Sequence, residues 1–313
     1  MKDGYGRTID YLRISITDRC NLRCTYCMPE EGIPCLAHGD ILTYEEIETI
    51  CRAMAQIGLK HVRITGGEPL VRRQCWRLVK KLRRVPGLQT VTLTTNGILL
   101  EEQAQQLVAA GLDGVNISLD TLDAAVYRSI TRCGDVSRVL AGLEQMQKYP
   151  QVTVKLNCVL GGVQWEQTAV AVAGLAKRCP VHVRFIERMP MGCGKDFGTY
   201  LPSQAVLDRC PELEPISHDG VAACYRLPDA KGTVGLIAPM SHAFCAECSR
   251  IRITADGKLK PCLHSDAEIT LRGLSGEELE QAIRRGILMK PERHHMDETG
   301  VTETHRGMFA IGG

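Results

Sequence analysis

The stretch of sequence that most restricts the fold reads CNLRCTYC and spans residues 20–27. Its thiols, Cys20, Cys24 and Cys27, are separated by three and then two residues, directly after a run that predicts a strand. A loop this short can bring three thiolates to one metal centre. A structural zinc site usually takes four protein ligands, so this set is one short. An iron–sulfur cluster held by three thiolates keeps one iron open. Three unrelated buried thiols are the alternative, since free cysteine is common in protein cores.

The composition narrows the class of protein. The 313 residues give room for one large domain and a smaller one. A net charge of +2 provides no global field that would attract nucleic acid, and no apolar run approaches the ~18 residues of a membrane span. Fifteen cysteines, an odd number, without a signal peptide argue against a disulfide framework. We therefore expect a reduced, cytoplasmic protein with no nucleic-acid partner and no membrane.

Strand and helix patterns alternate through the first two thirds of the chain, as in a parallel α/β fold. The predicted strands are Tyr11–Ile16, His61–Thr65, Thr90–Asn96, Gly114–Asp120, Val152–Val159 and Val181–Glu187. The predicted helices between them are Tyr44–Ile57 (with a capping box of Thr43 and Glu46), Val71–Arg84, Glu101–Ala110, Asp135–Lys148 and Gln164–Arg178. This number of strands favours a partial barrel over a complete eight-stranded one, although periodicity alone also allows a flat doubly wound sheet.

The two faces of these strands differ in character, because side chains alternate along a strand. One face is apolar and should pack against the helices. The other is polar and basic and carries Arg13, Ser15, Arg63, Thr65, Thr92, Thr94, Asn96, Asn116, Ser118, Asp120, Lys155, Asn157 and Arg184. An ordinary barrel interior is filled with branched apolar residues, and buried charges without partners are costly. The pattern therefore predicts a basic cavity for a polar ligand, in preference to a solvated sheet face.

The alternation ends after the sixth strand. Residues Met189–Tyr200 predict a Gly-rich loop, Ser203–Arg209 a short helix, and Arg250–Thr254 with Lys258–Lys260 a hairpin. A last helix is predicted near Glu277–Arg285, with Ser275 and Glu278 as a capping box, before a small flexible tail at residues 306–313. We place a boundary near residue 215, which gives domains of 1–215 and 216–313.

Two further motifs carry chemistry. The sequence GGEP, residues 66–69, follows the second strand, at the end where barrel enzymes place their active sites; a tight turn is the structural alternative. A second set of thiols comprises Cys245, Cys248 and Cys262. With His242 it could form a Cys3His zinc site. Between these thiols, Arg250 and Arg252 share one side of a strand, where their guanidinium groups suit a phosphate or a nucleobase edge.

The spacing CxxxCxxC with an aromatic before the last cysteine, here Tyr26, resembles the signature of the radical S-adenosylmethionine (SAM) superfamily. The resemblance implies a [4Fe–4S] cluster on the first thiol set, whose open iron binds SAM. Positions that resemble the superfamily's SAM contacts are Tyr26, Gly67, Ser118 and Met189.

Four motifs occur together in this chain: CxxxCxxC, CxxC-x13-C, Arg-x-Arg and the terminal Gly-Gly. With them, the chain resembles the GTP 3′,8-cyclase family (molybdenum cofactor biosynthesis protein A) over nearly its whole length. This resemblance implies a partial (β/α)6 TIM-like barrel with a smaller α+β domain carrying a second [4Fe–4S] cluster on Cys245, Cys248 and Cys262, which binds guanine. Positions that resemble the GTP contacts are Arg13, Arg63, Thr94, Lys155, Arg250, Ile251 and Arg252, with Arg184, Gly312 and Gly313 as additions.

The implied reaction is the radical cyclisation of GTP to 3′,8-cyclo-7,8-dihydro-GTP, the first step of molybdenum cofactor biosynthesis. It implies a flavodoxin- or ferredoxin-like reductant and product hand-over to cyclic pyranopterin monophosphate synthase, and it allows a homodimer. One alternative is another radical SAM enzyme with an auxiliary cluster that modifies a peptide, although a peptide backbone does not need so many cations. A second is a metal-binding protein without catalytic activity, either an electron carrier or a zinc module, which would not consume SAM.

Overall fold

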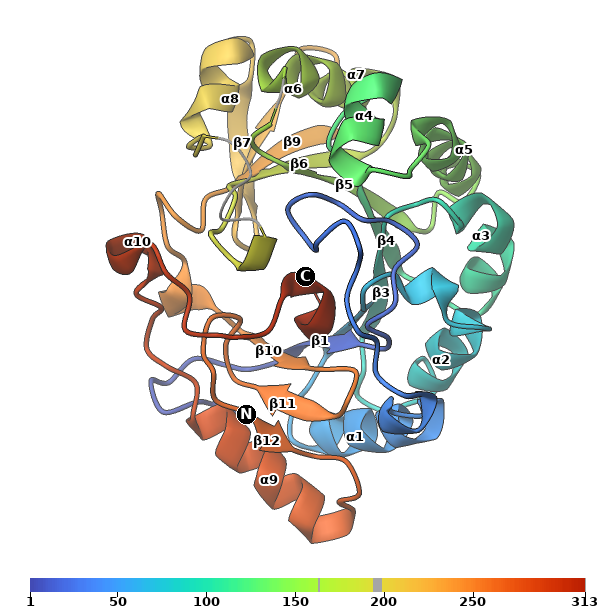
Figure 1. Ribbon diagram of the computed structural model, residues 1–313, viewed down its shortest axis with the longest axis vertical. Coiled ribbons are helices and arrows are strands. Elements are labelled where there is room, and N and C mark those ends of the chain that lie inside the picture. The colour runs from blue at the N-terminus through green and yellow to red at the C-terminus, as the bar shows by residue number, and fades with distance from the viewer. Residues whose placement is uncertain (163, 194–198, 313) are drawn as a thin grey trace.

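The computed structural model describes residues 1–162, 164–193 and 199–312. Within this part of the chain, six parallel strands follow one another in a curved sheet (Figure 1): β1 (Tyr11–Ser15), β2 (His61–Thr65), β3 (Thr90–Thr95), β4 (Gly114–Ser118), β5 (Thr153–Val159) and β6 (His182–Ile186). The helices on their outer side are α1 (Tyr44–Gln56), α2 (Cys75–Leu82), α3 (Leu100–Ala109), α4 (Ala124–Thr131), α5 (Val136–Gln147), α6 (Trp165–Ala173) and α7 (Leu175–Arg178). The predicted parallel α/β architecture is confirmed.

Strands from the C-terminal third extend this sheet at both edges. On one side β10 (Arg250–Ile253) pairs in parallel with β1 and continues into the antiparallel β11 (Lys258–Lys260) and β12 (Ile269–Thr270). On the other side β9 (Thr233–Ile237) pairs in parallel with β6 and continues into β8 (Ala222–Arg226) and β7 (Glu214–Asp219). The two predicted domains therefore share one sheet, with the predicted hairpin at β10–β11.

The apolar face of the strands packs against the helices as predicted. Leu12, Ile14, Val62 and Ile64 are fully buried within one large core that also takes in the inner faces of α1 and α2. The predicted capping box of α1 is present, since Thr43 Oγ1 accepts from the Glu46 amide and the Glu46 carboxylate accepts from the Thr43 amide. Burial of this apolar face, at roughly 25 cal/mol per Å², is the main stabilising contribution to the barrel.

Several predicted helices differ from the structure. The predicted Val71–Arg84 helix is a 3-10 turn at Pro69–Val71 followed by α2, because Gln74 takes a left-handed conformation. The Ser275 capping box of α9 (Gly276–Leu288) is absent, since Gly276 enters that helix with a φ of +53° and the Ser275 side chain makes no capping bond. The predicted Gln164–Arg178 helix is divided at Gly174, and α4 was not predicted at all.

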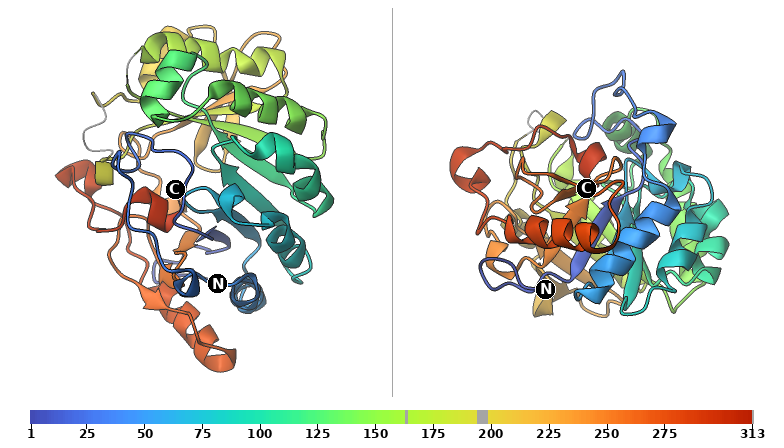
Figure 2. Two further views of the ribbon diagram at one scale, coloured as in Figure 1. Left: turned by 45° about the vertical axis from the view of Figure 1, so that its right-hand side comes forward. Right: turned by 90° about the horizontal axis from the view of Figure 1, so that it is seen from below.

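The C-terminal segment returns to the middle of the molecule. Figure 2 shows α9 beside α1 on the outside and the C-terminus inside the ring of strands. Two short helices follow α9, namely α10 (Met296–Thr299) and α11 (Met308–Ile311). The predicted tail thus contains a helical turn with Ile311 fully buried. Another short helix, α8 (Gln204–Arg209), matches the predicted Ser203–Arg209 segment.

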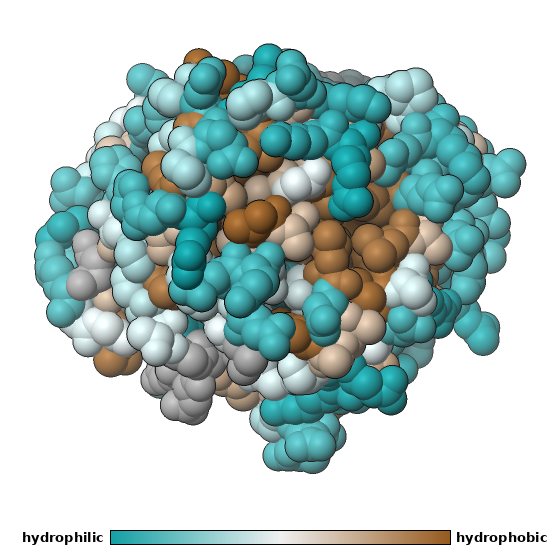
Figure 3. All heavy atoms as spheres, turned by 90° about the horizontal axis from the view of Figure 1, so that it is seen from above, coloured by the Kyte–Doolittle hydropathy of each residue, from teal (hydrophilic) through white to brown (hydrophobic). Residues whose placement is uncertain are grey.

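The surface carries both hydrophilic and hydrophobic side chains. Seen from above in Figure 3, hydrophilic side chains cover most of the periphery, and hydrophobic ones gather near the centre of that face. No helix among the described residues is long and apolar enough to span a membrane.

Candidate active site

A cavity of about 580 Å³ lies within the ring of strands. Both thiol sets line it, together with the polar strand face and residues from α11. Of the predicted site residues, those that line it are Cys20, Cys24, Cys27, Tyr26, Gly67, Ser118, Met189, Arg13, Arg63, Thr94, Lys155, Arg184, Arg250, Arg252, Cys245, Cys248 and Cys262. The fold therefore brings residues from both predicted domains to a single site.

The loop that carries the first thiol set is held by the end of α4. The Arg23 amide donates to the Thr131 carbonyl (3.1 Å) and the Thr25 amide to the Ile130 carbonyl (2.9 Å). Arg132 then donates to the carbonyls of Arg23 (2.8 Å) and Met28 (2.9 Å). The helix that sequence analysis missed thus shapes the cysteine loop from both ends.

The three thiols lie close together and are partly buried. Burial raises the pKa of Cys20 to about 11 and that of Cys27 to about 12. The pKa of Cys24 is raised well above its ordinary value, first by burial and then by the neighbouring Cys27. Thiolates are the form that binds metal, so a group that carries positive charge must stabilise them here. This donor set fits an iron–sulfur cluster, whose thiolates bind separate irons.

The GGEP turn packs directly on the cysteine loop. The Gly67 amide donates to the Thr17 carbonyl (2.7 Å), and a Cβ at Gly67 would lie 2.5 Å from the Arg19 carbonyl oxygen. The Glu68 carboxylate accepts from the amides of Leu70 (2.9 Å) and Asn96 (2.6 Å). Burial raises the pKa of Glu68 to about 7, although these hydrogen bonds oppose the shift. Residue 67 must be glycine, because there the backbone of the GGEP turn touches the backbone of Thr17 and Arg19.

Tyr26 is oriented by a carboxylate on the polar strand face. Its hydroxyl donates to Asp120 Oδ2 over 2.6 Å, and Asp120 Oδ1 accepts from the Val159 amide over 2.9 Å. Burial raises the pKa of Asp120, while the bond from Tyr26 acts in the opposite direction. Ser118 is close by at the end of β4, and Met189 belongs to a small apolar cluster with Met191 and Ile311. Asp120 was on the predicted polar face but was not predicted as a site residue.

Four arginines crowd one part of the cavity, namely Arg13, Arg63, Arg250 and Arg252. Burial and the charges of the other three lower the pKa of Arg13 well below its ordinary value. Burial and the charge of Arg250 lower the pKa of Arg252 to about 10. Such mutual repulsion between buried cations is relieved by an anion.

Unpaired polar atoms in the same wall also indicate a ligand. Arg13 Nε, Asn116 Nδ2 and Asn157 Oδ1 are buried without a hydrogen-bond partner. Buried polar atoms in native proteins are rarely left without a partner, so each calls for a ligand or water. The cavity thus fits a large polar anion.

Two other cations of the cavity, Lys155 and Arg184, are paired with a carboxylate that sequence analysis did not single out. Lys155 Nζ lies 2.7 Å from Asp219 Oδ2, and Arg184 Nη2 donates to the same oxygen. Burial alone would raise the pKa of Asp219, but the hydrogen bond from Lys155 and the charge of Arg184 hold it at about 2. The carboxylate is therefore ionised at neutral pH.

The second thiol set is held together by a buried lysine that was also missed. Lys290, only 3% exposed, donates to the carbonyls of Arg250 (2.8 Å) and Pro261 (3.0 Å). Arg250 lies two residues after Cys248, and Pro261 directly precedes Cys262. One ammonium therefore links the two chain segments that carry these cysteines. Burial would raise the pKa of Cys248, but the charges of Lys290 and Arg250 and the hydrogen bonds lower it.

Arg7, in the N-terminal segment, binds the chain segment that carries Cys245, the remaining cysteine of this set. Its Nη1 donates to the carbonyls of Cys245 (2.8 Å) and Glu292 (2.7 Å). Its Nε pairs with Asp3 over 2.6 Å. The N-terminal residues thereby fix the backbone at the first cysteine of the set.

The geometry does not support the alternative of a single zinc ion. His242, the predicted fourth ligand, is exposed and does not line the cavity. Across residues 1–162, 164–193 and 199–312, no three His, Cys, Asp or Glu side chains converge closely enough to hold one metal ion. A zinc site needs its ligands within about 2.0–2.3 Å of one point.

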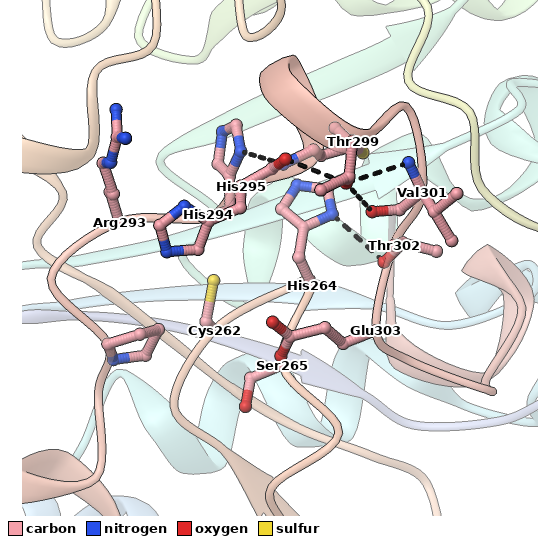
Figure 4. A pocket seen from close by; sticks show the side chains of 12 residues that line it. Cys262, His264, Ser265, Arg293, His294, His295, Thr299, Val301, Thr302 and Glu303 are labelled. Carbon is pink, nitrogen blue, oxygen red and sulfur yellow. Dashed lines mark hydrogen bonds between the residues drawn. The ribbon is translucent and has the colours of Figure 1, made fainter.

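A second cavity, of about 370 Å³, adjoins Cys262 (Figure 4). The Cys262 sulfur points toward His294, and the His264 and His294 rings meet edge to face with centroids 4.8 Å apart. Burial and the charge of His294 lower the pKa of His264 to about 3. His264 and His294 also line the large cavity, so the two cavities meet beside the second thiol set.

The C-terminal tail reaches the arginines. Arg252, 5% exposed, donates to the carbonyls of Ile311 (3.3 Å) and Gly312. Gly312 has a φ of +70°, and a Cβ there would lie 2.0 Å from Thr65 Oγ1. The Ile251 side chain packs in the core, which leaves only its backbone to serve a ligand. Gly313 lies outside the described residues.

Comparison with known proteins shows the family of this chain. A family profile described as "Radical SAM superfamily" matches residues 14–173, and one described as "Molybdenum Cofactor Synthesis C" matches residues 181–296. The chain is 47% identical to the GTP 3′,8-cyclase of Peptoclostridium acidaminophilum, over 99% of this chain and 98% of that protein. The GTP 3′,8-cyclase of Alkaliphilus metalliredigens is also 47% identical, over 100% of both chains. The chain belongs to the GTP 3′,8-cyclase family of radical SAM proteins.

Solved structures share the fold of this family member. Streptococcus suis SuiB bound to S-adenosylmethionine matches with a TM-score of 0.65 at 14% identity, over 89% of this chain and 68% of that one. The anSMEcpe structure with bound AdoMet matches with a TM-score of 0.54 at 17% identity, over 86% and 80% of the two chains. These likenesses confirm the radical SAM fold. Family membership supports the predicted enzyme and its cofactors, two [4Fe–4S] clusters and S-adenosylmethionine.

Proposed function

We propose that this protein cyclises GTP to 3′,8-cyclo-7,8-dihydro-GTP as the first step of molybdenum cofactor biosynthesis. The observation that carries the proposal is one cavity lined by two three-thiol sets and a group of arginine and lysine side chains, in a member of the GTP 3′,8-cyclase family. When bound, the clusters and SAM would supply the radical chemistry that takes the hydrogen from C3′ of GTP and the electron that completes the cyclisation after C3′ bonds to C8 of guanine. The chain itself supplies binding, orientation and exclusion of water.

The proposed roles follow from position. Cys20, Cys24 and Cys27 hold the SAM-binding cluster, while Tyr26, Gly67, Ser118 and Met189 shape the SAM site. Cys245, Cys248 and Cys262 hold the cluster that receives guanine. GTP is then bound by Arg13, Arg63, Thr94, Lys155, Arg184, Arg250, Arg252 and the backbone of Ile251, with the Gly312-Gly313 tail closing the site. The mutual repulsion of the arginines favours a ligand with several negative charges.

The protein's surroundings are also part of the proposal. We infer a flavodoxin- or ferredoxin-like electron donor and product hand-over to cyclic pyranopterin monophosphate synthase. Thiolate-bound clusters need a reducing compartment, which favours the cytoplasm. Residues 1–215 and 216–313 remain the proposed domains, although they share a sheet.

The decisive test follows SAM cleavage in the reconstituted, reduced protein. We expect 5′-deoxyadenosine to form only when GTP is present, with no such effect of ATP. SAM cleavage that does not depend on GTP would overturn the assignment of GTP as the substrate and would favour a peptide-modifying radical SAM enzyme.

A further inference from the structure

A carboxylate occupies the anion-binding wall of this cavity. Asp219 ends β7, at the tip of the β7–β8 hairpin, and lines the cavity together with Gly220. Its Oδ2 accepts from both Lys155 and Arg184. Among the ion pairs of the described residues, Asp219 is the carboxylate that contacts cations of the predicted polar strand face.

The cations that it contacts are placed to receive the phosphates of a nucleotide. Lys155 and Arg184 come from the adjacent strands β5 and β6, whereas the second thiol set adjoins β10. In the sheet, β10 and β1 lie at one side of the barrel, and β5 and β6 follow four to five strands beyond β1. Under the proposed function, a nucleotide whose base lies at the second thiol set would direct its phosphates away from that set, toward the strands that carry Lys155 and Arg184.

The strand that carries Asp219, β7, can be displaced at low cost. Every residue of β7 is exposed, and β7 is the last strand at its edge of the sheet. Elements with few buried apolar contacts open more easily than the core. The Asp219 side chain is itself 51% exposed, so the carboxylate can return to water when its partners are taken.

We propose that Asp219 is a displaceable stand-in for a substrate phosphate, which neutralises Lys155 and Arg184 until a triphosphate replaces it. This inference rests on the proposed function. It implies that GTP must compete with a carboxylate of the protein, and that ligands with few charges compete poorly. Without nucleotide, the pairing also keeps two half-buried cations from repelling each other.

The test compares wild type with Asp219→Asn by calorimetric titration of the reconstituted protein without SAM, so that no turnover occurs. The probes are GTP, inorganic tripolyphosphate and guanosine. A partly exposed ion pair corresponds to about 1.4- to 5-fold in an equilibrium constant. Loss of two such pairs should therefore tighten GTP and tripolyphosphate binding about 2- to 25-fold. Guanosine, which carries no phosphate, should bind both proteins equally. Glu214→Gln is the matched control, because it removes the same charge from the same hairpin away from the cavity, and it should change nothing.

Other outcomes overturn the inference. Weaker GTP binding by Asp219→Asn would mean that the carboxylate assists the nucleotide, and unchanged binding by a folded variant would mean that it does not compete. Should the variant fail to fold, hydrogen exchange of wild type decides, since tripolyphosphate must speed exchange in residues 214–226. Unchanged exchange there contradicts displacement. The proposed function fails separately, if GTP does not trigger 5′-deoxyadenosine while tripolyphosphate still binds Asp219→Asn more tightly.

Discussion

Replacing Lys290 by methionine tests whether one buried ammonium assembles the second cluster site. The ammonium donates to the carbonyls of Arg250 and Pro261, which lie beside two of the three thiols. Methionine keeps a side chain of similar length, so the change removes the charge and the donors while filling most of the space. The two chain segments that carry Cys248 and Cys262 then lose their common tie.

The size of the effect follows from the number of bonds lost. A hydrogen bond from a charged group contributes about 1.5–3 kcal/mol, so two contribute about 3–6 kcal/mol. A typical domain is stable by only about 5–15 kcal/mol, so the free energy of unfolding should fall by a large fraction. The reconstituted variant should hold about four irons per chain instead of about eight, because the first thiol set is untouched.

The assay is urea denaturation of the cluster-free protein together with iron analysis after reconstitution. Lys258→Met is the matched control, because Lys258 lies on β11 and its ammonium donates to the Thr270 hydroxyl near the surface (2.7 Å). The control should change stability by less than about 1 kcal/mol and keep both clusters. A Lys290→Met protein as stable as wild type and with about eight irons would refute the structural role that we assign to this lysine.

Gly67 and Arg306 provide two further tests. Gly67→Ala should abolish SAM cleavage and lower the iron content by about half, because the added Cβ would lie 2.5 Å from the Arg19 carbonyl oxygen. Gly39→Ala is the control, since a Cβ at Gly39 meets nothing within 4 Å; this variant should keep SAM cleavage and the full iron content. Arg306→Met should speed hydrogen exchange in α11, since Arg306 joins the tail to Asp256 over 2.9 Å. Burial would raise the pKa of Asp256, but its hydrogen bonds lower it. The ion pair between Arg306 and Asp256 is therefore fully formed at pH values above the ordinary aspartate pKa of about 4. It weakens only as the pH falls through the lower pKa that Asp256 has in the folded protein. Release of α11 between pH 8 and 6 would contradict this reasoning.

The strands and both thiol sets could be predicted because their signals are local. Alternation along a strand assigns each side chain to a face, and this pattern alone assigns Arg13, Arg63 and Lys155 to the face that lines the cavity. Helix α4 was missed even though Asp123 caps it by accepting from the Val126 amide, because its apolar pattern is short. That helix holds the cysteine loop.

The supporting residues could not be predicted from local patterns. Lys290 acts on Arg250, 40 positions away, and Arg7 acts on Cys245 across 238 positions. Asp219 meets Lys155 across 64 positions, on a hairpin that follows the alternating region. An isolated lysine, arginine or aspartate carries no spacing signal, so only the folded chain reveals what each one contacts.

The most direct test of the account combines metal analysis with turnover. After anaerobic reconstitution the protein is analysed for iron and zinc, then reduced with SAM in the presence and absence of GTP, and 5′-deoxyadenosine is measured by chromatography. The account predicts about eight irons per chain and 5′-deoxyadenosine that depends on GTP. About four irons with one zinc, or cleavage of SAM indifferent to GTP, would contradict it.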